Sequence, residues 1–310
     1  SLDAAKIAPS TRLNKLWAYG WIEQELGAVR LEQLTADRIE TALASMATAG
    51  LGQESLIKIR SVLNQICRFG ERRELLRRNP VGVVELPVGL DPSGEGRALS
   101  SCQAKTLLEA SASHRLHGLW STMLMLGLRP GEALALQWSA IDFEQSVLHV
   151  RRALRNGTNG LEITENLKTV RSRRSLQMPA PLVTALQDHR HAHDGERAHA
   201  MEAWSTEWPD LVFTTQFGTP INGSNLRRDF ARLTESAGLG RWTPNELRHT
   251  AVSLLSAEGL ALERIADIVG HTGTRMTAKV YRHVLTPSVD HAVGPMDALF
   301  GTLPSESTVE

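Results

Sequence analysis

Two arginines of this 310-residue sequence occupy places where a helix start should hold the side chain rigidly. Arg129 lies between the glycine that ends one apolar helix and the proline that begins the next, with Glu132 close enough to orient its guanidinium. Arg248 follows a capping box, Thr243 to Glu246, and shares a helix face with Asn245. A fixed guanidinium suits a phosphate or a similar anion. Taken alone, either arginine is also explained by a structural ion pair or a surface position.

Three further side chains could transfer a proton or attack an electrophile. Lys168 lies at a predicted hairpin tip, where surrounding positive charge lowers its pKa and makes it a potential proton donor. His271 comes directly after the glycine that ends a predicted helix, and Tyr281 follows ten residues later beside basic residues. Alone, Lys168 is better explained as a solvated turn residue and Tyr281 as a core aromatic.

These residues belong to five motifs that occur in a fixed order. The motifs are Gly-Leu-Arg-x-x-Glu, Lys-Thr-x-x-Ser-x-Arg, Leu-Arg-His-Thr, Val-Gly-His-Thr and Val-Tyr-x-His. Together they resemble the tyrosine recombinase (phage integrase) family, over a catalytic region of about residues 97–300, and the helical region 11–80 resembles that family's core-binding domain. Five ordered motifs are much less prone to coincidence than any one of them.

The resemblance implies a role for each residue in site-specific DNA recombination. Tyr281 is expected to attack a DNA phosphate and form a 3′-phosphotyrosine link, while Arg129 and Arg248 clamp the non-bridging oxygens. Lys168 is expected to protonate the departing 5′-oxygen, and His271 to hydrogen-bond the phosphate or assist proton transfer. The physical chemistry agrees, because two fixed guanidiniums stabilise a transition state that gathers negative charge on oxygen. No metal and no cofactor is expected.

One position departs from the family pattern. Asn245 stands where the family usually has the histidine of His-x-x-Arg. An amide can hydrogen-bond a phosphate oxygen but cannot exchange protons, so an acid–base role at this position is lost. We interpret Asn245 as a tolerated substitution and keep it in the predicted site.

The predicted fold class is mainly α with a small antiparallel β-sheet: a helical core-binding domain plus an α+β catalytic domain. We expect a helical, DNA-clamping domain over residues 1–86, a linker rich in Pro and Gly over 87–98, and the catalytic domain with a C-terminal tail over 99–310. A signature at Thr35 predicts a helix start in the first domain.

The catalytic domain should interrupt its helices with a β segment. The alternating side chains of residues 147–155 predict a strand, followed by a turn at 156–160 and a second, antiparallel strand at 161–164. A third strand is predicted at 174–178. Another short pair is expected around 217–220. Helices are predicted at 225–237, 244–257 and 260–269.

The sequence has 34 basic and 34 acidic residues, and this balance by itself counts against a nucleic-acid binder. The zero sum is a cancellation, however. Residues 58–78 and 151–174 each hold seven basic against two acidic residues, whereas 188–210 holds two basic against six acidic. Local patches steer an anionic partner, so the neutral sum does not exclude DNA. Either patch alone is better explained as a solvated face.

Composition excludes several other classes. No apolar stretch approaches the length of a membrane span, and residues 1–6 lack a secretory signal. Two cysteines are too few for a disulfide framework or a cysteine zinc site. Four histidines, at 189, 191, 193 and 199, could suggest a metal, but their spacing and acidic context favour a solvated, partly helical insertion. The tryptophans are expected to serve packing rather than base stacking.

The predicted partners are double-stranded DNA and further copies of the chain, as a homotetramer on two DNA sites, with accessory DNA-bending factors as additional candidates. The segment 296–300 is expected to form a short helix that docks on a neighbour. We expect a cytoplasmic, nucleoid-associated protein and no membrane partner. An N-terminal arm-binding domain could precede the given sequence. The alternatives are a type IB topoisomerase, which relaxes supercoils without pairing sites, and a catalytically silent DNA-binding regulator.

Overall fold

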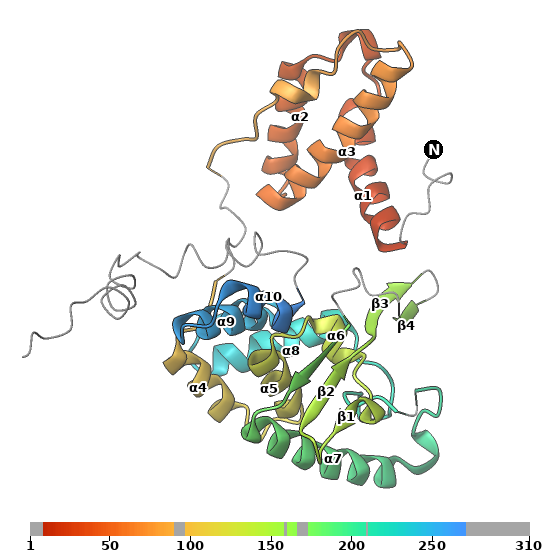
Figure 1. Ribbon diagram of the computed structural model, residues 1–310. Helices are drawn as coiled ribbons and strands as arrows, with labels where there is room; N and C mark the ends of the chain where they lie inside the picture. Colours follow the sequence, from red (N-terminus) through yellow and green to blue (C-terminus); the bar gives the residue numbers. More distant parts are fainter. Residues whose placement is uncertain (1–8, 90–96, 158–159, 166–172, 209, 271–310) are drawn as a thin grey trace, which may run out of the picture. The chain divides into compact units, whose positions relative to one another are not determined.

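The computed structural model describes residues 9–89, 97–157, 160–165, 173–208 and 210–270. The chain divides into two compact units. Unit 1 comprises Ser1–Glu95 and Leu154–Thr164, and unit 2 comprises Gly96–Ala153 and Glu165–Glu310. Figure 1 shows a mostly helical protein with small sheets, which confirms the predicted fold class.

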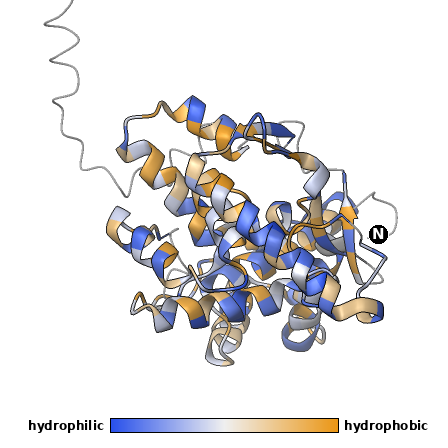
Figure 2. Ribbon diagram, turned by 90° about the horizontal axis from the view of Figure 1, so that it is seen from below, coloured by the Kyte–Doolittle hydropathy of each residue, from blue (hydrophilic) through white to orange (hydrophobic). Residues whose placement is uncertain are grey.

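Unit 1 is built on three helices, α1 (Pro9–Leu26), α2 (Ala36–Thr48) and α3 (Gln53–Arg72), with 3-10 turns η1 (Leu31–Gln33) and η2 (Pro80–Val83). The predicted start of α2 is confirmed, because the Thr35 side chain accepts a hydrogen bond from the backbone N of Arg38. Figure 2 shows hydrophobic and hydrophilic residues alternating along the helices, the pattern of amphipathic helices packed on a core. In unit 1 the apolar faces meet in a core that includes Ile39, Leu43, Leu56, Ile59 and Leu63.

Unit 2 packs its helices around α5 (His117–Leu126), eight of whose ten residues are buried. Helices α7 (Ala180–Ala200) and α9 (Pro244–Ala257) lie against it on opposite sides (Figure 1). The ring of Trp120 stacks at a tilt on Phe230 of α8 (Gly223–Ser236), with centroids 4.7 Å apart. The remaining helices are α4 (Ser101–Ala110), α6 (Pro130–Leu134) and α10 (Leu262–Val269), with 3-10 turns η3 (Trp138–Ala140) and η5 (Met201–Ala203). Because α5 is largely apolar and eight of its ten residues are buried, the neighbouring helices must cover it on all sides.

A three-stranded antiparallel sheet of order β1-β2-β5 belongs to unit 2, with β1 (Ile141–Asp142), β2 (Val147–Val150) and β5 (Arg174–Gln177). Its register pairs Leu148 with Leu176 and Val150 with Arg174. The strands β3 (Ala153–Gly157) and β4 (Gly160–Thr164) pair in a separate two-stranded sheet. The predicted β segment is thereby confirmed, although it divides between two sheets.

The predicted helices at 225–237, 244–257 and 260–269 correspond to α8, α9 and α10. The short pair around 217–220 is reduced to one bridge between Thr214 and Pro220. Within the described residues, no helix is long and apolar enough to cross a membrane.

The expectation of a solvated histidine insertion is wrong for two of its members. Residues 180–200 form one continuous helix, α7, and place His189 and His193 one turn apart on its buried face, while His191 and His199 are exposed. His193 lies against the rings of Trp138 and Trp204, at 5.8 and 5.1 Å between centroids. The spacing of four between His189 and His193 was the signal, hidden by the histidine that lies between them. Among the described residues no group of three side chains could hold a metal ion.

Candidate active site

The elbow between α5 and α6 holds Arg129. Helix α5 ends at Gly127, whose φ of 61° is left-handed, and Arg129 caps α6 in an extended conformation. Glu132 then accepts two hydrogen bonds from Arg129: one from Nη1 at 2.7 Å and one from the backbone N at 3.1 Å. The predicted orientation of Arg129 by Glu132 is therefore confirmed. The Arg129 side chain remains 41% exposed, so it can still meet an incoming group.

Glu132 is almost fully buried and also binds a second arginine, because Arg174 Nη2 donates to its Oε2 at 3.0 Å. Burial by itself would raise the pKa of Glu132, but the charges and hydrogen bonds of Arg174 and Arg129 outweigh burial and hold that pKa below its usual value. The carboxylate is consequently ionised at neutral pH.

Helix α9 carries Arg248 into the same region. The Arg248 side chain is buried, and its Nη1 donates a hydrogen bond to the backbone O of Gly127 at 2.7 Å. Its Nη2 is buried without a hydrogen-bond partner among the described residues. Burial lowers the pKa of Arg248 to about 9, assisted by the positive charges of Arg129 and Arg174 and opposed by Glu132. Among the described residues, Arg129, Arg174 and Arg248 therefore face a single carboxylate, that of Glu132.

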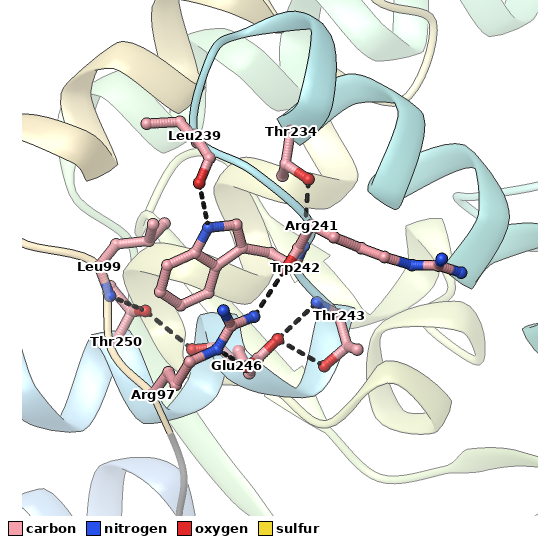
Figure 3. Close-up of polar contacts among 9 residues, drawn as sticks. All are labelled: Arg97, Leu99, Thr234, Leu239, Arg241, Trp242, Thr243, Glu246 and Thr250. Carbon is pink, nitrogen blue, oxygen red and sulfur yellow. Dashed lines mark hydrogen bonds and ion pairs between the residues drawn. The ribbon is translucent and has the colours of Figure 1, made fainter. Parts of the chain in front are cut away.

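The start of α9 is fixed by a polar cluster, shown in Figure 3. Thr243 and Glu246 form the predicted capping box, in which the Glu246 carboxylate accepts from the Thr243 backbone N at 2.6 Å. Arg97 donates from Nε to the other Glu246 oxygen at 2.8 Å and lies over the Trp242 ring at 4.3 Å. One turn further along, Thr250 Oγ1 accepts from the backbone N of Leu99 at 3.0 Å. Residues 97–99 thus hold the helix that bears Arg248.

Asn245 lies in the first turn of α9, three residues before Arg248, and its side chain is exposed. An exposed amide at a helix start can hydrogen-bond an anion, and no hydrogen bond joins the Asn245 side chain to another described residue.

The end of α10 approaches the same arginines. Gly270 caps this helix with a φ of 68°, and its backbone O accepts from Arg129 Nη2 at 3.1 Å. Helix α10 packs on α9 through an apolar cluster formed by Val252, Ile265 and Val269. The chain position that follows Gly270 is His271.

The model of the phage integrase family matches residues 97–287. An integrase of Streptomyces ambofaciens is 34% identical over 287 residues, covering 89% of this chain and 71% of that protein. The chain belongs to the phage integrase family. The predicted class of enzyme, a tyrosine-type site-specific DNA recombinase, is thereby confirmed.

Other relatives of this phage integrase family member agree. A XerC-like tyrosine recombinase of Caldanaerobacter subterraneus is 26% identical and covers 89% of this chain and 74% of that protein. The Tn1549 transposon integrase, solved in complex with transposon right end DNA, has a TM-score of 0.79 at 21% identity and covers 95% of both chains. A lambda integrase dimer bound to a core site has a TM-score of 0.63 at 18% identity over 90% of both chains. At these identities the two solved structures show a shared fold.

The predicted site residues divide into two groups. The structure brings Arg129 and Arg248 together around Gly127 and places Asn245 at the start of the same helix as Arg248. Lys168, His271 and Tyr281 lie outside the described residues. Sequence reasoning gave no role to Arg174, although it closes the lysine motif, because nothing in that motif shows that its last arginine is buried.

Proposed function

We propose that this recombinase cuts and rejoins DNA through a 3′-phosphotyrosine intermediate formed on Tyr281. The observation that carries the proposal is the buried guanidinium of Arg248, whose Nη2, beside Arg129, has no hydrogen-bond partner among the described residues. In the described residues three arginines, at 129, 174 and 248, surround one carboxylate, Glu132. A buried excess of positive charge is costly unless an anion joins it, and a phosphodiester supplies that anion.

The two guanidiniums act on the phosphate. Arg129 and Arg248 bind its non-bridging oxygens, where negative charge accumulates in the transition state. They also stabilise the attacking phenolate, since a tyrosine with a pKa of about 10 needs a positive surround near neutral pH.

The remaining residues handle protons and orientation. The Tyr281 hydroxyl gives up its proton, to His271 or to water, and its oxygen forms a bond to phosphorus. The bond from phosphorus to the 5′-oxygen breaks, and Lys168 gives the departing 5′-oxygen a proton. His271 hydrogen-bonds the phosphate or assists proton transfer. Asn245 contributes a hydrogen bond only, because its amide does not titrate.

DNA contact outside the site is assigned to two clefts. In unit 1, a cleft of about 590 Å³ along α3 is lined by three arginines, Arg60, Arg68 and Arg78, and one acidic residue, Glu71. In unit 2, a cleft of about 450 Å³ beside β2 and β5 is lined by four arginines and one glutamate: Arg151, Arg152, Arg173, Arg174 and Glu165. Such local charge binds the DNA backbone in spite of the neutral sum.

The finer organisation belongs to the same proposal. Residues 1–86 form the DNA-clamping domain, 87–98 the linker and 99–310 the catalytic domain. Four copies assemble on two DNA sites, with residues 296–300 docking on a neighbour and with accessory DNA-bending factors as further partners. The DNA substrate locates the activity to the nucleoid in the cytoplasm.

A nicked suicide substrate, from which the cleaved strand diffuses away, tests the proposal. Wild-type protein should accumulate a covalent protein–DNA complex that Tyr281→Phe abolishes. Unchanged trapping in that variant removes Tyr281 from the mechanism. Absence of any covalent complex in the wild type indicates a silent DNA-binding protein, and supercoil relaxation without a site requirement indicates a topoisomerase.

A further inference from the structure

Arg174 occupies a position between three segments of the site. It is the first residue of β5, and its side chain is 7% exposed. Nη2 donates to Glu132 Oε2 at 3.0 Å, and Nε donates to the backbone O of Ile268, in the last turn of α10, at 2.6 Å. One guanidinium therefore joins the carboxylate of α6 to the end of α10.

The contacts of Arg174 and Arg129 close into a ring. Arg129 Nη1 binds Glu132 Oε1 at 2.7 Å, and Arg129 Nη2 binds the backbone O of Gly270 at 3.1 Å. Ile268 and Gly270 are two positions apart in the chain, so both arginines hold Glu132 at one side and the end of α10 at the other. Each link of the ring limits the freedom of the next, and the Arg129 guanidinium is held from both sides.

Two residues of the ring are close in sequence to other predicted site residues. Arg174 is six positions after Lys168, and Gly270 immediately precedes His271.

We propose that Arg174 is a positioning residue of the recombination reaction, which acts through Glu132 and α10 to fix the guanidinium of Arg129 against the scissile phosphate. This inference rests on the proposed function. Arg174 lines the cleft beside β2 and β5, but it is assigned no contact with the scissile phosphate.

Two acceptors of Arg174, Glu132 Oε2 and the backbone O of Ile268, explain why a guanidinium is needed. Its Nε and Nη2 reach acceptors on different elements at the same time, whereas a lysine offers one nitrogen on a flexible stem. Arg174→Lys thus keeps a cation beside Glu132 but cannot hold both links. The substitution therefore breaks the ring of hydrogen bonds while changing the charge of the site as little as possible.

A double-mutant cycle on the full chain tests the role. Cleavage of the suicide substrate is measured at saturating DNA for the wild type, Arg174→Lys, Arg129→Lys and the double variant. Arg174→Lys should slow cleavage by about tenfold or more and leave the Kd for DNA within about threefold, because an interaction specific to the transition state is lost. If Arg174 acts through Arg129, adding Arg174→Lys to Arg129→Lys should slow cleavage by only about twofold further.

Arg232→Gln is the matched control, because Arg232 is a 77% exposed arginine paired with Asp229 away from the ring. It should cleave within about twofold of the wild type. Thermal unfolding of each variant reports whether the fold is intact, and Arg174→Gln provides a second variant if the lysine variant unfolds early.

The outcomes separate this inference from the proposed function. Equal fold losses in the two backgrounds overturn the positioning role, and so does a parallel loss of DNA affinity, cleavage and thermal stability, which marks a purely structural residue. A wild type that forms no covalent complex overturns the proposed function and the inference together. A coupled loss in Arg174→Lys with unchanged DNA binding supports both.

Discussion

Arg248 donates a hydrogen bond to the backbone O of Gly127, a residue 121 positions earlier in the chain. The bond ties the second turn of α9 to the end of α5, two residues before Arg129. The two arginines of the predicted clamp are thus set relative to each other by one backbone carbonyl.

Replacing Arg248 by Lys should separate cleavage from binding. Lysine keeps a positive charge, but it cannot bond Gly127 and an anion with a planar fork. We expect cleavage to fall by about 100-fold or more, the usual effect of losing a donor to the transition state, and DNA affinity to fall by less than about fivefold. Single-turnover cleavage and equilibrium DNA binding check the two values. Near-normal turnover would remove Arg248 from the clamp.

Gly127→Ala should destabilise unit 2. A Cβ at this position would lie 2.7 Å from Val269 Cγ1 and 3.3 Å from Ala251 Cβ, and the φ of 61° is itself unfavourable for alanine. We expect a loss of about 1–3 kcal/mol in the free energy of unfolding, measured by urea denaturation. The control is Gly195→Ala in α7, where a Cβ meets nothing within 4 Å and should stabilise the helix. Equal effects of the two changes would contradict the steric argument.

Glu132→Gln should remove a stability term that depends on pH. The pKa of Glu132 is lowered in the folded state, so its contribution is complete above its unfolded pKa near 4.5 and is lost as the pH falls through the lower folded value. The variant should be less stable by about 3–5 kcal/mol at pH 7, because the buried Arg174 and the partly exposed Arg129 lose an ionised partner. The difference should shrink below pH 4.5. Urea denaturation at both pH values measures it, with exposed Glu258→Gln as control. A difference independent of pH would refute the ionised role of Glu132.

His193→Phe should reduce the loss of folding stability as the pH falls. Burial among aromatic rings lowers the pKa of His193, with Asp194 and Glu196 opposing the effect and Arg115 and Arg197 adding to it. Below pH 6.5 the unfolded chain therefore binds a proton that the folded chain resists, and stability falls by at most about 1.4 kcal/mol per pH unit for this group.

The check for His193 is the Tm between pH 7.5 and pH 5. His193→Phe should reduce its decline, while the same change at the exposed His191 should not. If the Tm of His193→Phe falls with pH as much as that of the wild type, the acid sensitivity belongs to other groups, such as His189.

The sequence predicted the elements of the site better than their burial. Capping signals are local, so the starts of α6 and α9 and the end of α10 could be placed from a few residues each. The contacts that join these elements are not local: Arg248 to Gly127 and Arg174 to Ile268 span 121 and 94 positions. No spacing rule reports such pairs.

The histidines of α7 show the same limit in another form. Charged neighbours suggested a solvated segment, but helical periodicity buries every residue that faces α5 and the aromatic cluster, whatever its neighbours in sequence are. Tertiary packing decided between the two expectations.

The burial of Arg248 has one more consequence. Its guanidinium loses most of its hydration when the chain folds, before any substrate arrives. An anion that reaches Nη2, which has no hydrogen-bond partner among the described residues, therefore meets a cation with little hydration left to lose. Little solvent then needs to reorganise as the reaction proceeds. Folding free energy, rather than binding free energy, carries the cost of dehydrating this charge.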